Sequence, residues 1–376
     1  MNNTFDITSY GAKGDGITDC TAAIQKALDD AGLCGGAVTV PPGTYVTSTL
    51  HIREGTSLNG ISAWSFRDYG ASVFVLRDLD VECMLDITDA FGCTINRMCF
   101  NGRGIGKGIH GIMLQRDRYN GGNKEDTPTI DNCRIGDFSG DGVHLNHVWC
   151  FSIRHSMLCR NKGAGLYIDG WDGFIIDNWL SGNKGGGIRG GGAASSITAT
   201  GNRVEWNYPA GFDLPHTYCC NFTGNYFDRS GGPALILGDE NGNASSVSVT
   251  GNVIYRSGKP YEDEVHGYLE FENPYDSSHI RITNGDGIVV SGNSFRVGQD
   301  DDEKGYYSPD YVAVIRKSRY CIIKDNTWFY GCTKAGFLEK DENLNVEISG
   351  NLGSVADWAS QYNAQLLKNK VIGELQ

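Results

Sequence analysis

Two acidic residues, Asp213 and Glu270, are the side chains best suited to acid–base chemistry in this sequence. They hold equivalent positions in the short segments Gly211–Pro215 and Tyr268–Glu272, where side chains alternate between two faces of a predicted strand. Cleavage of a glycosidic bond requires one carboxylic acid to protonate the leaving oxygen and one carboxylate to activate water or attack the sugar. Asp213 and Glu270 are therefore our first candidates for an acid and base pair.

Two further acidic residues, Asp169 and Glu205, are secondary candidates for catalysis. Asp169 falls in the neighbouring outward column of side chains, where its structural alternative is an ion pair with Arg189. Glu205 lies on the strand before Asp213, with Asp228 stacked on it in the next repeat. The Glu205 side chain either reaches around the turn to the face that carries Asp213 or serves only the face of its own strand.

Substrate contacts are expected from polar and aromatic side chains on the same outward face and in the adjoining turns. A lone histidine or tyrosine on a sheet face more often contacts a ligand or solvent than acts as an acid or base. Aromatic rings in turns and in the longer insertions are suited to stacking on sugar rings, although such rings also pack beneath loops. The predicted contacts are Arg189, His144, Tyr167, Trp206, Glu272 and Trp171.

The elements that place these residues are repeats of about 23 residues. Each repeat has a short β-type segment, an Asn, a second short segment, a Gly-rich turn and a third segment. Asn tolerates the left-handed backbone of a tight turn, and its amide can bond to stacked neighbours. The predicted ladder positions are Asn132, Asn178, Asn202, Asn225, Asn252, Asn293, Asn326 and Asn351, with His155 filling one slot.

Three strands in each repeat, with no helical period between them, predict an all-β, right-handed parallel β-helix with an N-terminal capping helix. A β-propeller would need about 40 residues per repeat and hairpin turns. Residues 19–28, ended by Gly32, have the pattern of an amphipathic helix. The expected organisation is a cap at 1–60, the β-helix at 61–353 and a C-terminal cap or tail at 354–376. Insertions are expected at 116–126, 258–266, 273–286 and 296–310.

The segment Tyr10–Asp19, the helix after it and the Val40–Tyr45 strand and turn resemble the N-terminal signature of the pectate-lyase-like superfamily. The resemblance implies a β-helix that hydrolyses, eliminates or binds glycans, as glycosidases, polysaccharide lyases and phage tailspikes do. The rung pattern is also distantly similar to inulin fructotransferases. The polygalacturonase motifs Asn-Thr-Asp, Gly-His-Gly and Arg-Ile-Lys are absent, so the catalytic residues of polygalacturonases cannot be carried over.

The composition limits the binding partners that the protein can have and the cellular compartment in which it is expected. The net charge of −13 opposes binding to nucleic acid or an anionic membrane. The chain as given starts without a signal peptide, so its twelve cysteines are expected to be free, buried thiols in a cytoplasmic protein, or a secreted one if a leader was removed. No group of residues has metal-ligand spacing, and no cofactor is expected.

We expect a carbohydrate-active enzyme, a glycoside hydrolase or transglycosidase that uses a carboxylate pair on an oligo- or polysaccharide. A polysaccharide lyase or an intramolecular glycosyl (fructo)transferase is the alternative, and a non-catalytic glycan-binding spike is a further one. The resemblance favours a homotrimer.

Overall fold

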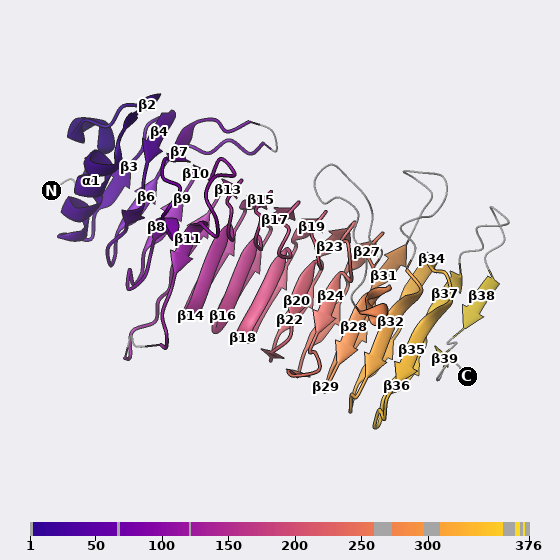
Figure 1. Cartoon of the computed structure of the whole chain (residues 1–376). Helices are drawn as coiled ribbons and strands as arrows, with labels where there is room; N and C mark the ends of the chain where they lie inside the picture. The colour runs from indigo at the N-terminus through magenta and orange to yellow at the C-terminus, as the bar shows by residue number, and fades with distance from the viewer. Residues whose placement is uncertain are drawn as a thin grey trace. The chain divides into compact units, whose positions relative to one another are not determined.

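The structure is a computed structural model that describes residues 3–65, 68–119, 122–258, 273–296, 309–355, 365–368 and 371–372. It consists of two compact units, Met1–Gly185 and Gly186–Gln376, which are described one at a time. Each unit is a coil of short strands that stack into two sheets, as the predicted right-handed parallel β-helix requires (Figure 1). The named strands of the described residues pair in parallel, apart from β37 with β38, which excludes a propeller built from hairpins.

The described residues of unit 1 form one α-helix and one short 3-10 helix besides the strands. The helices are η1 (Ile7–Tyr10) and α1 (Thr21–Gly32). Its first sheet is made of β1 (Thr4–Asp6), β3 (Ala37–Thr39), β5 (Leu50–His51), β6 (Ser57–Asn59), β8 (Cys83–Asp86), β9 (Thr94–Asn96), β11 (His110–Leu114), β12 (Thr129–Asp131), β14 (Val143–Arg154) and β16 (Leu166–Ile176). Its second sheet is made of β2 (Asp15–Asp19), β4 (Gly43–Thr47), β7 (Ser72–Leu76), β10 (Cys99–Asn101), β13 (Arg134–Gly136), β15 (Met157–Cys159) and β17 (Trp179–Ser181).

Unit 2 repeats the same arrangement and adds the short helix η2 (Pro274–Asp276). Its first sheet is made of β18 (Ile188–Thr200), β20 (Phe212–Leu214), β21 (Thr217–Tyr218), β22 (Asn221–Thr223), β24 (Leu235–Leu237), β25 (Ala244–Ser245), β26 (Ser248–Thr250), β28 (Ser278–Thr283), β29 (Gly285–Asp286), β30 (Val289–Ser291), β32 (Tyr311–Arg316), β33 (Ile322–Lys324), β35 (Ala335–Lys340), β36 (Glu347–Ser349) and β39 (Val371–Ile372). Its second sheet is made of β19 (Arg203–Glu205), β23 (Tyr226–Asp228), β27 (Val253–Tyr255), β31 (Ser294–Arg296), β34 (Thr327–Cys332), β37 (Leu352–Val355) and β38 (Gln365–Lys368).

The core of each unit is the inside of the coil. Alternation along the strands predicts six inward residues on the strands that carry the candidate site, and all six are buried, with exposed fractions of 0–2%. They are Val143, Leu145, Leu166 and Ile168 in unit 1, and Phe212 and Leu214 in unit 2. Because inward and outward positions alternate, the residues between them must face solvent or the loops.

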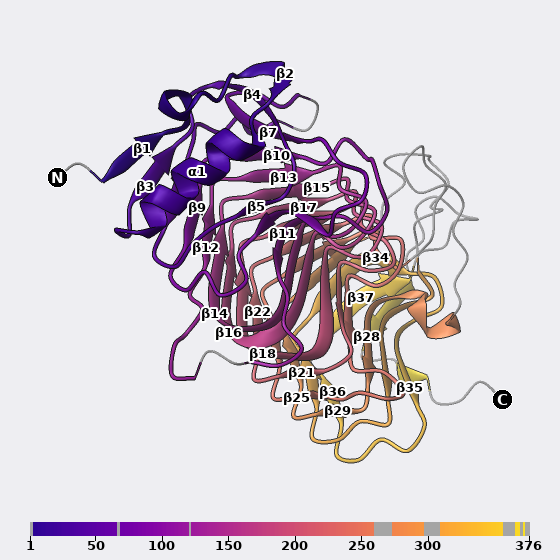
Figure 2. The same ribbon diagram turned by 60° about the vertical axis from the view of Figure 1, so that its left-hand side comes forward.

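The predicted N-terminal cap is present in unit 1 (Figure 2). Helix α1 buries Ile24, Ala27, Leu28 and Ala31, whose spacing of three and four residues places them on one face. This face packs against β1, β3 and β5 and closes the open end of the coil. The side chain of Asp19 starts the helix by accepting hydrogen bonds from the backbone N–H and the hydroxyl of Thr21.

Buried asparagines join the rungs of unit 2 in a continuous ladder, as predicted. The Asn202 Nδ2 donates to Asn225 Oδ1 at 2.9 Å, and the Asn225 Nδ2 donates to Asn252 Oδ1 at 3.1 Å. The same pattern continues through Asn293 and Asn326 to the last rung, with 2.9 Å at each step. Each ladder residue is at most 3% exposed, so these amides satisfy one another where water cannot.

The ladder prediction was wrong by one residue at two slots in unit 1. The backbone N–H of Ser156 donates to Asn178 Oδ1 at 3.0 Å, and the N–H of Cys133 donates to Ser156 Oγ at 3.1 Å. Ser156 and Cys133 therefore hold the buried slots that were expected for His155 and Asn132, which are exposed. Both exposed residues have positive φ, at 45° and 53°, so they make the turn beside the slot and not the ladder itself.

Little of the expected C-terminal cap falls within the described residues. Residues 365–368 form β38, which pairs antiparallel with β37, and the remainder of 356–370 lies largely outside the described part. No helix among the residues that the structure describes has the length and apolar character needed to cross a membrane.

All twelve cysteines are described, and all are free thiols. Nine of them are buried, whereas Cys34 and Cys219 are exposed and Cys150 is intermediate. Burial raises the pKa of Cys93 and of Cys133 to about 12, so both thiols stay protonated and unreactive.

The ladder gives a direct stability test. Asn225→Leu removes a buried amide that serves both neighbouring rungs, and we expect it to lower the free energy of unfolding by about 2–4 kcal/mol. Denaturant unfolding of the variant would be compared with that of Asn221→Leu, which replaces an exposed asparagine of β22. Equal stability of the two variants would contradict the role of the ladder.

The thiols give a second test. Titration of the denatured, unreduced protein with a thiol reagent should find close to twelve free thiols per chain. A count near zero would show that the cysteines pair in disulfides.

Candidate active site

Four strands in the first sheet of unit 2 place a row of outward side chains next to one another. Arg189 on β18 is in register with Asp213 on β20, and Asp213 is in register with Ile236 on β24. Ile236 is in turn in register with Arg281 on β28. Adjacent strands lie about 4.8 Å apart, so Asp213 has an arginine on the neighbouring rung on one side and a second arginine two rungs away on the other.

The predicted alignment of the rungs was wrong at β28. It gave the position beside Ile236 to Glu270, in the segment Tyr268–Glu272, whereas Ser278–Thr283 forms the strand that pairs there. Both segments alternate polar and apolar residues, so the pattern fits either one once an insertion separates the rungs. Glu270 and Glu272 themselves lie outside the described residues, and their roles stay predictions.

Asp213 is an unusual carboxylate on this face. Burial raises the pKa of Asp213; the charges of Arg281 and Arg189 lower it in part, and the charge of Asp239 raises it again. No hydrogen bond to the Asp213 carboxylate occurs among the residues that the structure describes. The carboxyl group therefore keeps its proton to higher pH than an ordinary aspartate, which is the property a general acid needs.

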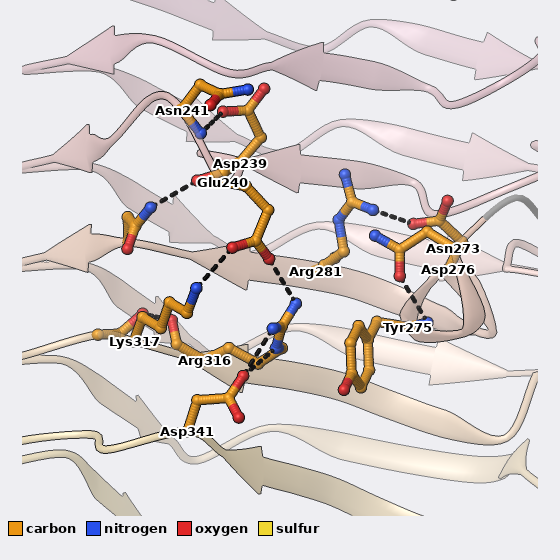
Figure 3. Close-up of polar contacts among 12 residues, drawn as sticks. Asp239, Glu240, Asn241, Asn273, Tyr275, Asp276, Arg281, Arg316, Lys317 and Asp341 are labelled. Atoms are coloured by element: carbon orange, nitrogen blue, oxygen red, sulfur yellow. Dashed lines mark hydrogen bonds and ion pairs between the residues drawn. The ribbon is translucent and has the colours of Figure 1, made fainter.

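Arg281 is nearly buried, with an exposed fraction of 9%. Its Nη1 donates to Asp276 Oδ1 at 2.6 Å, and Asp276 belongs to η2, whose first turn is capped by the Asn273 side chain (Figure 3). Within the described part of the chain, the Arg281 Nε is buried without a hydrogen-bond partner. One edge of this guanidinium is therefore held in place by η2.

A second group of charges holds the loop that follows β24. Glu240 accepts from Arg316 Nη1 at 2.9 Å and from Lys317 Nζ at 2.6 Å, and Arg316 also binds Asp341 (Figure 3). The hydrogen bond from Lys317 holds the pKa of Glu240 below its ordinary value, and Arg316 adds to this shift. The Arg316 guanidinium lies 4.1 Å from the ring centre of Tyr275. Glu240 is thus an ionised, paired carboxylate with a structural role.

Asp239, in the same loop, is a carboxylate that sequence reasoning missed. Its Oδ1 accepts the backbone N–H groups of Asn241 and Gly242 at 2.7 and 2.6 Å, which fixes a tight turn (Figure 3). Asp239 comes three residues after Ile236, which is in register with Asp213. Its effect on the pKa of Asp213 shows that the two carboxyl groups interact.

Glu205 and Trp206 belong to the other side of unit 2. Glu205 is on β19 of the second sheet, in register with Asp228 as predicted, and accepts from Arg203 Nε at 2.7 Å. The Arg229 guanidinium lies 4.5 Å from the ring centre of Trp206. These contacts give Glu205 a partner on the side face, away from the sheet that carries Asp213.

The predicted contacts His144 and Tyr167 lie next to each other in unit 1. They are in register on β14 and β16, and their rings stack at 4.4 Å with an angle of 4° between their planes. His144 Nδ1 lies 2.7 Å from Asp141 Oδ2, and His110 Nδ1 lies 3.3 Å from the same oxygen. The sequence analysis found no residues with metal-ligand spacing, but these three side chains converge because turns bring separate rungs together.

A polar hollow of about 520 Å³ adjoins this group in unit 1, lined by Asp80, Val81, Glu82, Lys107, Gly108, His110, Met113 and Gln115. Burial acts to raise the pKa of Asp141, but the contacts with His110 and His144 and the hydrogen bond from the Ala164 N–H outweigh burial, so the pKa of Asp141 falls below the ordinary range. Asp141 is therefore ionised.

The remaining predicted residues of unit 1 lie to the side of this hollow. Asp169 is in register with Asn146, two residues beyond the stacked pair His144 and Tyr167. Trp171 makes an edge contact with Tyr119 at 5.9 Å between ring centres, so it packs against the insertion at 116–126. This is the structural alternative considered for aromatic residues near insertions.

The chain is similar in sequence to known proteins over part of its length. The family described as rhamnogalacturonase A/epimerase, pectate lyase-like, matches residues 4–205. The probable rhamnogalacturonase C of Aspergillus flavus is 48% identical over 69 residues, which are 16% of this chain and 15% of that protein. This chain spans only 4% to 15% of the length of the four curated relatives compared.

Solved structures resemble the chain over nearly its whole length. The mannuronan C-5 epimerase A-module from Azotobacter vinelandii has a TM-score of 0.62 at 16% identity, covering 98% of this chain and 99% of the module. A DFA-IIIase from Arthrobacter chlorophenolicus has a TM-score of 0.62 at 14% identity, covering 99% and 93%. At these identities the likeness shows the fold, a parallel β-helix. Together with the family match, it confirms the predicted resemblance to pectate-lyase-like proteins.

The electrostatics of Asp213 can be tested through stability. Since the pKa of Asp213 is raised in the folded state, the folded protein binds more protons than the unfolded one above about pH 4, and the free energy of unfolding falls as pH rises through that window. Asp213→Asn removes this cost, so we expect its melting temperature at pH 7 to equal or exceed that of the wild type. The difference should shrink as the pH falls toward about 4.

Glu240→Gln is the matched control, because its pKa is shifted the other way and its loss should lower the melting temperature at pH 7. An Asp213→Asn variant that melts well below the wild type at pH 7 would show that the carboxylate is ionised and stabilised by the arginines.

Proposed function

We propose that this chain, which belongs to the rhamnogalacturonase A/epimerase family of pectate lyase-like proteins, is a carbohydrate-active enzyme that cleaves a glycosidic bond in an oligo- or polysaccharide. The observation that carries the proposal is Asp213, a largely desolvated carboxyl group with a raised pKa on the outward face of unit 2. A carboxyl group that keeps its proton to higher pH than an ordinary aspartate can donate that proton to a leaving glycosidic oxygen.

In the proposed mechanism, Asp213 protonates the leaving oxygen as the bond to the anomeric carbon breaks. The transition state leaves negative charge on the Asp213 carboxylate, next to the guanidinium groups of Arg281 and Arg189. Because these charges are already in place, they stabilise the carboxylate as it forms and lower the barrier to proton transfer. Arg281 and Arg189, whose charges only partly offset the effect of burial on the pKa of Asp213 before the reaction, thus stabilise the Asp213 carboxylate once the proton has left.

A second carboxylate must activate water or attack the sugar. Asp239 is the described candidate, since it lies in the loop beside Asp213 and its turn uses Oδ1 alone. Glu270 is the candidate predicted from the sequence. Turnover by Asp239→Asn and by Glu270→Gln distinguishes the two candidates. Asparagine at 239 keeps an oxygen that can hold the turn, so a loss of turnover in Asp239→Asn shows that the negative charge of Asp239 is needed.

The substrate classes to examine first are those that the matched proteins and the resemblance name: rhamnogalacturonan, mannuronan and inulin. Product masses separate the reaction classes. If the summed mass of the products exceeds the mass of the glycan by one water, the reaction is hydrolysis. If one product is one water lighter than the corresponding hydrolysis product, the reaction is elimination by a lyase or intramolecular transfer.

Asp213→Asn should lower turnover of the cleaved glycan by at least about a hundredfold, the usual scale for loss of a general acid. The wild-type rate should fall as pH rises through the pKa of Asp213, because only the protonated acid acts. Asp286→Asn is the matched control, since this carboxylate lies on β29 of unit 2, where it pairs with Arg319. Turnover by Asp213→Asn at the rate of Asp286→Asn would remove the proposed role.

A further inference from the structure

Three side chains of unit 1, His110, Asp141 and His144, present one ligand atom each to a common point. These atoms all lie within 4.8 Å of one another. His144 Nδ1 and His110 Nδ1 are 2.7 and 3.3 Å from the same carboxylate oxygen, Asp141 Oδ2. The exposed fractions of the side chains are 21%, 12% and 14%, so the group is largely shielded but reaches the surface.

Each imidazole has a ring nitrogen beside the Asp141 carboxylate that can act as a metal ligand. His144 Nε2 lies 3.1 Å from the Gln115 side-chain oxygen; when the proton of a neutral ring is on Nε2, this contact is a hydrogen bond and Nδ1 presents its lone pair to the carboxylate side. His110 Nδ1 accepts the backbone N–H of Asp141 at 3.0 Å, so its lone pair is occupied until an ion binds. A metal ion at this point would replace the contacts by which the two imidazoles hold the Asp141 carboxylate.

The three residues are held by rigid neighbours. His110 begins β11, and His144 lies on β14, two strands that pair directly. Asp141 Oδ1 accepts the Ala164 N–H at 2.7 Å, which orients the carboxylate, and Gln115 orients His144. Hydrogen bonds of this kind, from the far side of a ligand, are a regular feature of protein metal sites.

We propose that His110, Asp141 and His144 form a binding site for a divalent transition metal ion such as Zn²⁺. Two imidazole nitrogens and one carboxylate oxygen suit ions of this class better than Ca²⁺ or Mg²⁺, which prefer oxygen ligands. The ion would lie at the edge of the polar hollow that His110 and Gln115 line. Its remaining coordination positions face that hollow and would take water or the oxygen of a bound molecule.

The other histidine–carboxylate pairs of unit 1 lack these features. His155 Nδ1 lies 2.8 Å from Asp131 Oδ1, and His51 Nδ1 lies 3.2 Å from Asp86 Oδ2. In both pairs the histidine side chain is about half exposed, at 50% and 53%, and it is the only imidazole at its carboxylate. His155→Ala is therefore a matched control for loss of an imidazole next to an aspartate.

The ligands should differ in strength. Coordination of His110 Nδ1 would replace its contact with the Asp141 N–H, whereas His144 gives up no backbone contact. We therefore expect His110→Ala to weaken binding less than His144→Ala does. Gln115→Leu keeps all three ligands and removes only the group that orients His144, which typically costs about 10-fold to 100-fold in affinity.

The test is calorimetric titration of the full-length protein, first stripped with EDTA and then freed of it, with ZnCl₂ near neutral pH. We expect one Zn²⁺ per chain, at least about a hundredfold weaker binding in His144→Ala and Asp141→Asn, and unchanged binding in His155→Ala. Co²⁺ bound at the site should give a visible d–d absorption that His144→Ala abolishes. Thermal melts without metal show whether each variant is folded, and His144→Ala and Gln115→Leu leave the Asp141 contact with the Ala164 N–H in place.

Three results would overturn the proposal: no stoichiometric Zn²⁺ binding by the wild-type protein, binding that persists in His144→Ala, or Ca²⁺ binding of equal affinity. If no Zn²⁺ binds, the imidazoles and Asp141 are joined by hydrogen bonds alone; in the other two cases the ion is held by other groups or by oxygen ligands. None of these readouts depends on glycan cleavage, so failure here leaves the proposed role of Asp213 untouched, and the reverse also holds.

Discussion

The register of stacked parallel strands determines which side chains can interact in each unit. Rungs repeat about every 4.8 Å, so an outward side chain has its closest partners one rung above and one rung below. In unit 2 the buried ladder from Asn202 to Asn351 fixes this register, because each amide bonds to the same position on the next rung. The interaction of Asp213 with Arg189 follows from this constraint, and so does the stacking of His144 on Tyr167 in unit 1.

Within this regular frame, burial and pairing decide what each carboxylate does. Glu240 has two cationic partners and a lowered pKa, so it stabilises its loop as an anion. The Asp213 carboxylate accepts no hydrogen bond from the described residues, and the effect of burial on its pKa outweighs the charges of the two arginines. Asp141 is also buried, but its hydrogen bonds keep it ionised. The same chemical group, a carboxyl, therefore serves as a structural anion in Glu240, a candidate acid in Asp213 and a candidate ligand in Asp141.

The sequence predicts the elements more reliably than the partners between them. Alternation gave the inward residues such as Val143 and Phe212 correctly, because the strand period is a local property. The sequence predicts Glu270 beside Ile236, whereas the structure has Arg281 there. The prediction fails because nothing in the sequence shows where the insertion between these two rungs ends. His155 was assigned to a ladder slot that Ser156 holds, since a turn residue and its neighbour cannot be told apart by spacing. The convergence of His110 with Asp141 depends on two turns and has no signature in either segment alone.

The proposed role of Asp213 as general acid requires this carboxyl group to be protonated where an ordinary aspartate is not. Carbon-detected NMR of protein labelled with ¹³C at the aspartate carboxyl groups measures this directly, with Asp213→Asn identifying the resonance by its loss. We expect that resonance to titrate clearly above the usual aspartate value of about 3.9. A midpoint at or below that value would mean that Arg281 and Arg189 hold Asp213 as an anion, and Asp213 could not then be the general acid.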